Sequence, residues 1–477
     1  MNEVFTRIKR TMINGITIGD RHFEFLAFGN SQFREHGAYF FAPLPHLTAQ
    51  DIRTWMGYFR DIKIVAKHAA RLGQCFSTTR AINCTRVEIR EIMDIERNGY
   101  TFTDGVGKIS NFLAQLVTSE LNITTASGEP PSVFQFRLGG CKGVLAVSPD
   151  AKMREIHIRP SQYKFPAMHN GLEIIRWSQF AAATLNRQLI LVLSALGVDD
   201  DVFVRKLKEM LLNLEQAMTD EKMALHLLQK YIDPNQMTMT VAGMILEGFQ
   251  HSKEPFVTSL LQLWRAWSIK YLKEKAKILI EKGAFLFGCI DETATLKGHF
   301  DNDPHLGPDA TYQNWVEALP QIFLQISARK PGDRPLVIEG PCLLARNPSL
   351  HPGDIRVVNA VNIPALWHLK DVVVLPQTGN RDISSMCSGG DLDGDDYLAI
   401  WDPELYPKEW NHVPMDYTPP KPKEVEREIT VNDITNFFVT YMKNDRLPTI
   451  AHAHLALGDY MDLGVKDEKC KCCLIYT

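Results

Sequence analysis

The chain has 477 residues, of which 45% are hydrophobic and 23% charged, so its composition is that of a folded protein and excludes wholesale disorder. The 52 basic and 56 acidic residues give a net charge of −4, so no overall basic excess indicates a nucleic-acid ligand. The nine cysteines are scattered, which favours reduced thiols, and only the terminal cluster of Cys470, Cys472 and Cys473 could suggest a metal.

The hydropathy pattern gives no sign of a membrane protein. The longest apolar run, residues 189–198, is about half as long as a helix that spans a bilayer. The first residues lack the apolar segment of a secretory signal. We therefore expect no membrane partner, and a nuclear or cytoplasmic location, or both, rather than secretion.

The length predicts two to four domains, and the first two regions mix strands with a helix. In the N-terminal flanking region, residues 1–99, a strand is expected at 23–28, and a helix from Thr48, which can cap it. Its apolar face continues at helical spacing as far as Ala69. Residues 100–168 read as short strands separated by glycines, which suggests a small β-barrel, with strands at 134–138, 144–147 and 156–158.

The remaining chain alternates between helical and strand-rich regions. Residues 169–282 predict a long helical connector, because leucines and tryptophans recur on helical faces. Strands return in 283–412, and residues 413–477 predict a proline-rich linker followed by helices over 429–462. The fold class is therefore α+β, and the two strand-rich regions could form a paired architecture. The strands expected in 283–412 are 284–290, 335–338, 354–358, 372–375 and 397–401.

The strongest functional signal is the acidic run Ser388-Gly-Gly-Asp391-Leu-Asp393-Gly-Asp395-Asp396. The carboxylates of Asp391, Asp393 and Asp395 point the same way in an extended chain, and Gly394 lets the backbone curl so that they converge. Unpaired, such carboxylates repel and raise one another's pKa. A divalent cation removes this conflict, and oxygen-only ligands favour Mg²⁺, with Mn²⁺ as the second choice.

Two other interpretations of this run stay open beside the metal site. A solvated acidic turn has the same residue types. An EF-hand also uses alternating aspartates, but its sixth position would be Asp396 where glycine is needed, and its twelfth would be Asp402 instead of the usual glutamate. A strand-like segment also follows in place of the exiting helix, so the EF-hand is disfavoured.

Several cations could serve as counter-charges to a phosphate. Lys108 and Lys142 each lie between glycines, but neither matches the P-loop pattern, and each alone is more typical of a hairpin turn. If they lie beside an acidic metal-binding loop, both lysines could bind the phosphates of a nucleotide. Arg346, Arg356 and Arg80 could each clamp a phosphate or a base, or form structural pairs instead. His452 and His454 have no further ligands nearby and are expected to be packing residues.

With these residues in view, the chain resembles the eukaryotic cell-encoded RNA-dependent RNA polymerases of RNA silencing. The Asp-Leu-Asp-Gly-Asp core of the acidic run is the most specific part, and it is more distantly similar to the Asp-Phe-Asp-Gly-Asp loop of multisubunit RNA polymerases. The resemblance covers nearly the whole chain, and it also includes residues 23–28, 66–77, 104–110, 346–354, 414–419 and 437–455.

The resemblance implies a fold and a set of site residues. The fold would be two double-psi β-barrels that form a catalytic cleft, joined by the helical connector and flanked by helices. Asp391, Asp393 and Asp395 would hold the catalytic Mg²⁺, and Lys108 and Lys142 would approach them from the first barrel. Arg346 would be a further ligand of the nucleotide phosphates.

The implied activity is that of an RNA-directed RNA polymerase, a nucleotidyltransferase. It would copy a single-stranded RNA template with ribonucleoside triphosphates, and the double-stranded product would enter RNA-mediated gene silencing and siRNA production, with silencing-complex proteins as further partners. The alternatives are a catalytically impaired RNA-binding silencing factor and, from the carboxylates alone, a metal-dependent nuclease.

The C-terminal end departs from the family pattern after Cys470, so we expect a truncated member. An apolar helical face would then lack the residues that cover it, and the helices that carry it would be exposed or frayed. The members of this face are Ile434, Phe437, Phe438, Tyr441 and Met442.

Overall fold

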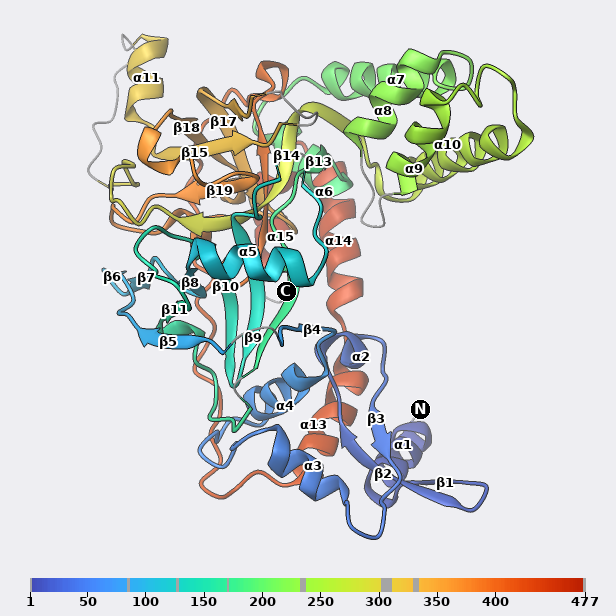
Figure 1. The fold of residues 1–477 in the computed structure, drawn as a ribbon, viewed down its shortest axis with the longest axis vertical. Helices are drawn as coiled ribbons and strands as arrows, with labels where there is room; N and C mark the ends of the chain where they lie inside the picture. Colours follow the sequence, from blue (N-terminus) through green and yellow to red (C-terminus); the bar gives the residue numbers. More distant parts are fainter. Residues whose placement is uncertain are drawn as a thin grey trace.

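The computed structural model describes residues 2–83, 86–125, 128–169, 171–231, 237–301, 311–328 and 334–474. Figure 1 shows four parts: an N-terminal module at the bottom, a β-sheet above it, a second strand-rich body at the top left and a helical arm at the top right. Cys84 lies outside the described residues.

The N-terminal module is an antiparallel three-stranded sheet surrounded by helices. Thr48 caps α3 as predicted, and its hydroxyl and the Asp51 carboxylate form a capping box. The prediction of a single helix from Thr48 to Ala69 is wrong, because α3 ends at Met56. The next residue, Gly57, lies so close to the Phe165 ring that an added Cβ would be 2.7 Å from it. The elements are α1 (Asn2–Asn14), β1 (Ile16–Ile18), β2 (Arg21–Ala27), α2 (Asn30–Arg34), β3 (Tyr39–Phe41), α3 (Ala49–Met56), α4 (Val65–Gly73) and η1 (Gln74–Phe76).

The central sheet has seven strands in the order β4-β12-β9-β10-β8-β11-β5. The strands expected at 134–138, 144–147 and 156–158 are confirmed as β9, β10 and β11, and α5 packs Leu113 and Val117 against them. β12 joins this sheet although it lies in the range expected to be helical. The elements are β4 (Arg80–Ala81), β5 (Glu88–Glu91), β8 (Val106–Ile109), α5 (Asn111–Glu120), β9 (Val133–Leu138), β10 (Cys141–Val147), β11 (Glu155–Ile158), η2 (Pro160–Gln162) and β12 (Leu172–Trp177), with the hairpin β6 (Glu96–Arg97) and β7 (Tyr100–Thr101).

The second strand-rich body is a closed barrel of six strands, in which β14-β19-β15-β18-β17-β20 ends with β20 paired to β14. Each strand segment expected in 283–412 is confirmed, whereas β15 and β17 were not anticipated. The elements are β13 (Ala181–Thr184), β14 (Leu279–Ile290), α11 (Tyr312–Ala318), β15 (Gln321–Ile326), β16 (Leu336–Val337), β17 (Gly340–Arg346), η3 (Pro352–Asp354), β18 (Arg356–Ala360), η4 (Pro364–Leu366), β19 (Val372–Leu375), α12 (Ile383–Met386), β20 (Asp396–Ile400) and η5 (Pro403–Leu405).

The helical arm lies between β13 and β14 and has its own apolar core around Leu214, Leu228 and Leu261. The helices occupy a shorter range than the expected 169–282, because β12, β13 and the start of β14 fall inside it. None of the described helices combines the length and the apolar character that a bilayer crossing requires. The helices of the arm are α7 (Asp200–Gln216), α8 (Glu221–Lys230), α9 (Met237–Leu246) and α10 (Pro255–Lys275). α6 (Arg187–Ala195) precedes the arm and packs on the barrel and the C-terminal helices.

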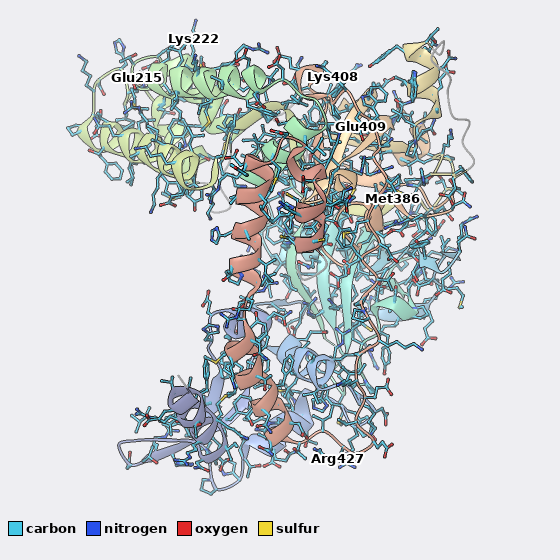
Figure 2. All side chains as sticks on the ribbon, turned by 180° about the vertical axis from the view of Figure 1, so that it is seen from behind. Glu215, Lys222, Met386, Lys408, Glu409 and Arg427 are labelled. Carbon is cyan, nitrogen blue, oxygen red and sulfur yellow. The ribbon has the colours of Figure 1, made fainter. Side chains whose placement is uncertain are left out.

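The C-terminal helices form a column behind the molecule. Figure 2 shows α13 (Val431–Asn444) and α14 (Leu447–Tyr460) running from the N-terminal module, near Arg427, up toward Glu409. At the upper end of the column the chain turns through η6 (Gly464–Lys466), and α15 (Glu468–Leu474) packs beside α14. The helices expected over 429–462 are thus confirmed.

The expectation that the apolar face of α13 is exposed or frayed is wrong. Phe438 is 2% exposed, and its ring centroid lies 5.1 Å from that of Phe28 in the N-terminal module. Phe33 stacks on Phe437 at 5.4 Å and on Tyr441 at 4.0 Å. The cover therefore comes from residues about four hundred positions earlier in the chain, which the local sequence could not reveal.

Candidate active site

The acidic run forms a tight loop between α12 and β20 of the barrel. The backbone N–H of Asp391 donates to the Asp395 carboxylate at 3.1 Å, and that of Asp393 donates to the Asp391 carboxylate at 3.2 Å. The hydroxyl of the fully buried Tyr397 donates to the Asp391 carbonyl at 2.9 Å. Gly394 adopts a φ of +129°, which glycine reaches far more readily than other residues. These bonds hold the three aspartates within one tight loop, and their joint binding of a metal stays a prediction.

Crowding of the carboxylates changes their acidity. Burial, together with the charges of Asp393 and Asp395, raises the pKa of Asp391 to about 7. Burial opposes ionisation of Asp393 as well, but the ammonium of Lys142 outweighs it and lowers the pKa of Asp393. Asp391 therefore ionises less readily than an ordinary aspartate unless a cation joins the group.

Two of the predicted cations contact this loop from opposite sides. Lys142, at the start of β10 in the central sheet, forms an ion pair with Asp393. Arg346, at the end of β17 in the barrel, lies 2.5 Å from Asp395 through Nε and donates to the Ser388 carbonyl at 3.1 Å. The structure thus brings Lys142, Arg346 and the carboxylates together.

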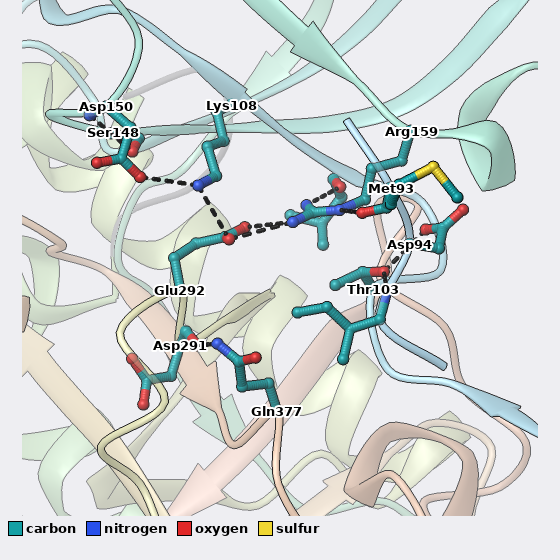
Figure 3. A network of polar contacts seen from close by, with 12 residues as sticks. Met93, Asp94, Thr103, Lys108, Ser148, Asp150, Arg159, Asp291, Glu292 and Gln377 are labelled. Atoms are coloured by element: carbon teal, nitrogen blue, oxygen red, sulfur yellow. Dashed lines mark hydrogen bonds and ion pairs between the residues drawn. The ribbon is translucent and has the colours of Figure 1, made fainter. Parts of the chain in front are cut away.

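Lys108 does not join them. Its ammonium lies 2.9 Å from Asp150 and 3.1 Å from Glu292, and Glu292 also accepts two bonds from Arg159, at 3.0 and 3.1 Å (Figure 3). The expectation that both lysines approach the loop is wrong for Lys108. The parallel pairing of β8 with β10 sets Lys108 opposite Ala146, four residues beyond Lys142, which is about 13 Å along the strand.

Three cations near the loop were missed by the sequence analysis. Arg71, Arg137 and Lys164 each lie within electrostatic reach of Asp393, and burial lowers the pKa of all three. Arg137 lies directly opposite Lys142 in the pairing of β9 with β10. A signal existed for two of them: Arg71 belongs to the stretch 66–77 that carries the family resemblance, and Arg137 occupies a polar position of an alternating strand.

The central sheet also holds the backbone of the loop. The N–H of Leu392 donates to the Asp104 carbonyl at 2.9 Å. Gln135 donates to the Asp393 carbonyl at 3.3 Å, and Arg176 donates to the Gly394 carbonyl at 2.5 Å. A Cβ at Gly394 would lie 2.0 Å from Gln135 Nε2, so any other residue here would displace the Gln135 side chain from its bond to the loop. The loop of one body is therefore seated on the other.

The residues present fit a divalent cation by their chemistry. The donors are carboxylate oxygens only, which hard cations such as Mg²⁺ prefer, and the raised pKa of Asp391 is the conflict that such a cation removes. Among the described residues, no three acidic, histidine or cysteine side chains are arranged as a set of metal ligands. In the acidic loop this is because Asp393 and Asp395 form ion pairs with Lys142 and Arg346.

The other basic candidates have local partners. Arg356 is 2% exposed and donates to the His412 carbonyl at 2.6 Å, which is a structural role. The Arg80 guanidinium lies 5.5 Å from the centre of the Trp177 ring. Of the two histidines expected to be packing residues, His454 is buried in α14, whereas His452 is exposed, so the expectation is wrong for His452.

Comparison with known proteins decides the family. The sequence matches the profile of the RNA dependent RNA polymerase family over residues 1–474. The chain belongs to this family. It is 42% identical over 466 residues to RNA-dependent RNA polymerase 1 of Schizosaccharomyces pombe, covering 94% of this chain and 37% of the relative. It is 40% identical over 474 residues to RNA-dependent RNA polymerase 1 of Arabidopsis thaliana, covering 98% of this chain and 40% of the relative.

This member of the RNA-dependent RNA polymerase family therefore spans about two fifths of the length of those two relatives. Its fold is similar to the solved structure of RNA dependent RNA polymerase QDE-1 from Thielavia terrestris, with a TM-score of 0.70 and 19% sequence identity. The similarity covers 97% of this chain and 55% of that chain. The family resemblance seen in the sequence is confirmed, and the fold is a mixed α/β structure with one closed six-stranded barrel.

Proposed function

We propose that this chain forms the catalytic core of an RNA-directed RNA polymerase. It would copy a single-stranded RNA template with ribonucleoside triphosphates, and the double-stranded product would serve RNA silencing and siRNA production. One observation carries the proposal: in a chain of this family, three gathered carboxylates lie opposite Lys142 and Arg346, which is the charge pattern that nucleotidyl transfer needs.

Asp391, Asp393 and Asp395 would hold Mg²⁺, with Mn²⁺ as a substitute. When bound, the metal would neutralise charge on the triphosphate and activate the 3′-hydroxyl nucleophile. Lys142 and Arg346 now pair with two of these carboxylates, so they are placed to neutralise the phosphates of a nucleotide bound at the same point. Arg137 and Arg71 would extend this positive surface along the central sheet.

The finer architecture that we propose is a pair of double-psi β-barrels that face each other across a cleft. The closed barrel would be the second of the pair, and the central sheet would contain the first. Three hydrogen bonds hold the acidic loop of the barrel against Asp104, Gln135 and Arg176. They support this arrangement, because residues of both the barrel and the central sheet then position the acidic loop. Lys108 is not included among the nucleotide ligands, since its charge is matched by Asp150 and Glu292.

The partners that follow from this function are single-stranded RNA, ribonucleoside triphosphates and proteins of a silencing complex. Base pairing would read the template, so the chain needs contacts to phosphates and 2′-hydroxyls rather than to base edges. We propose a nuclear location, a cytoplasmic one, or both.

The test is incorporation of labelled nucleotides on single-stranded RNA in the presence of Mg²⁺ or Mn²⁺. The chain should incorporate nucleotides, and Asp395→Ala should abolish incorporation in a variant that circular dichroism shows to be folded at the assay temperature. Asp61→Ala, which removes a carboxylate exposed on the N-terminal module, is the matched control and should retain activity. Full activity of Asp395→Ala, or no template-dependent synthesis by the folded wild-type chain with either metal, would contradict the proposal.

A further inference from the structure

The segment from Asn411 to Thr418, which we call the strap, crosses the acidic-loop side of the barrel without forming a helix or a strand. It overlaps the proline-rich segment 413–422, which predicted a linker, yet it is fixed to the barrel at several points. Asn411 exchanges two hydrogen bonds with the backbone of Val357, at 2.8 and 3.0 Å. Arg381 donates to the Met415 carbonyl at 2.9 Å. A segment held in this way is part of the barrel rather than a tether.

The strap ends at a buried hydrogen bond. The Tyr417 hydroxyl donates to the carboxylate of Asp354 at 2.5 Å, and Asp354 is fully buried. The other carboxylate oxygen accepts from the N–H groups of Leu350 and His351, both at 2.8 Å. Burying a carboxylate is costly unless its oxygens are bonded, so Tyr417 supplies one of the bonds that make this position tolerable.

Beside this pair, the chain that leads into the acidic loop adopts an unusual conformation. Ser388 has a φ of +55°, in the left-handed region that non-glycine residues avoid at a cost of about 1–2 kcal/mol. Such a residue persists only when its surroundings hold it. Tyr417 supplies such a contact, because its side chain packs directly against this turn. A Cβ at the next residue, Gly389, would lie 2.8 Å from Tyr417 Cβ.

The Ser388 turn is connected directly to the reacting groups. Its hydroxyl donates to the Pro348 carbonyl at 2.6 Å, and its carbonyl accepts from Arg346 at 3.1 Å. The same guanidinium lies 2.5 Å from the Asp395 carboxylate. A change in the Ser388 backbone would therefore move both the counter-charge Arg346 and the start of the acidic loop.

We propose that Tyr417 and Asp354 are a positioning pair, which holds Ser388 in its left-handed turn and thereby sets the place of Arg346 relative to the acidic loop. Neither residue touches the carboxylates of the loop in the contacts described above. The inference rests on the proposed function for the chemistry that the loop performs, but the conformational part stands independently of it.

The first experiment compares Tyr417→Phe with Tyr406→Phe. Tyr406 is the matched control, because its hydroxyl also donates inside the barrel, to the Pro341 carbonyl, away from the acidic loop. Tyr417→Phe should lower kcat about tenfold and change the KM for nucleotide less than about twofold, whereas Tyr406→Phe should change neither by more than about twofold. Amide hydrogen exchange over residues 387–392 should accelerate in Tyr417→Phe alone.

A rescue experiment separates positioning from a general loss of stability. Glycine adopts a φ of +55° without a steric cost, so Tyr417→Phe should cost about half or less as much in rate when it is made in a Ser388→Gly chain, which itself lacks the hydroxyl bond to Pro348, as when it is made in the wild type. Equal rates and equal exchange in the two tyrosine variants, or the same cost of Tyr417→Phe in both chains, would overturn the inference. If the wild-type chain makes no RNA, the proposed function fails, and the exchange measurement alone then decides the inference.

Discussion

Glu292 offers a quantitative test of how the central sheet and the barrel are joined. It follows β14 of the barrel, and its carboxylate accepts from Arg159 and Lys108, which both belong to the central sheet (Figure 3). The side chains of Arg159, Lys108 and Glu292 are 3%, 12% and 20% exposed. Removing one partner from a buried ionic group leaves unpaired charge and costs about 3–5 kcal/mol.

We expect Glu292→Gln to lower the free energy of unfolding by about 3 kcal/mol, the lower end of that range, because the amide oxygen still accepts one bond. Asp150→Asn is the matched control, since it removes a carboxylate from the same Lys108 at a position whose side chain is 64% exposed. An exposed pair is worth less than about 1 kcal/mol, so this variant should be nearly as stable as the wild type.

The assay is urea-induced unfolding at neutral pH, followed by circular dichroism, with hydrogen exchange over residues 106–109 and 290–296 to locate the effect at the interface. The measurement is repeated in 1 M salt, which should reduce the small effect of Asp150→Asn and leave most of the effect of Glu292→Gln. Equal destabilisation by the two variants, or a loss below about 1 kcal/mol in Glu292→Gln, would refute the reasoning.

Two further predictions concern the C-terminal column. Phe438→Ala should destabilise the chain by about 3–5 kcal/mol in the same urea assay, because the ring is 2% exposed and packs on Phe28; a loss below about 1 kcal/mol would contradict the packing described for α13. A bidentate bond from Arg427 lowers the pKa of Asp433, so this pair stabilises α13 above the unfolded-state pKa of about 4 and loses that effect as the pH falls below it. Melting temperatures between pH 6 and pH 2.5 should therefore fall more steeply for the wild type than for Asp433→Asn, and parallel curves would contradict the assignment.

The acidic loop could be predicted from the sequence because its geometry is local. Hydrogen bonds inside the loop itself, between Asp391, Asp393 and Asp395, hold the three aspartates close together. The cations could be predicted only in part, because their positions depend on strand register. Lys142 and Lys108 look alike in the sequence, yet the pairing of β8 with β10 sends them to different places. Register is a tertiary property that no local pattern of these residues contains.

The strands that were missed have a different cause. β15 is buried along nearly its whole length, so it lacks the alternation that identifies a half-buried strand. β17 begins with Gly340 and Pro341, which usually argue against a strand. The strap was interpreted as a linker for the same reason, since prolines disfavour regular structure but do not prevent side chains from fixing the backbone.

The most direct test of the central claim is to sequence the RNA made by this chain on two different single-stranded templates of known sequence, each supplied with all four ribonucleoside triphosphates and Mg²⁺. The account predicts that each product is the complement of the template supplied and that Asp395→Ala yields none. Products whose sequence is independent of the template, or templates that are only shortened, would contradict it and indicate terminal nucleotide addition or nuclease activity instead.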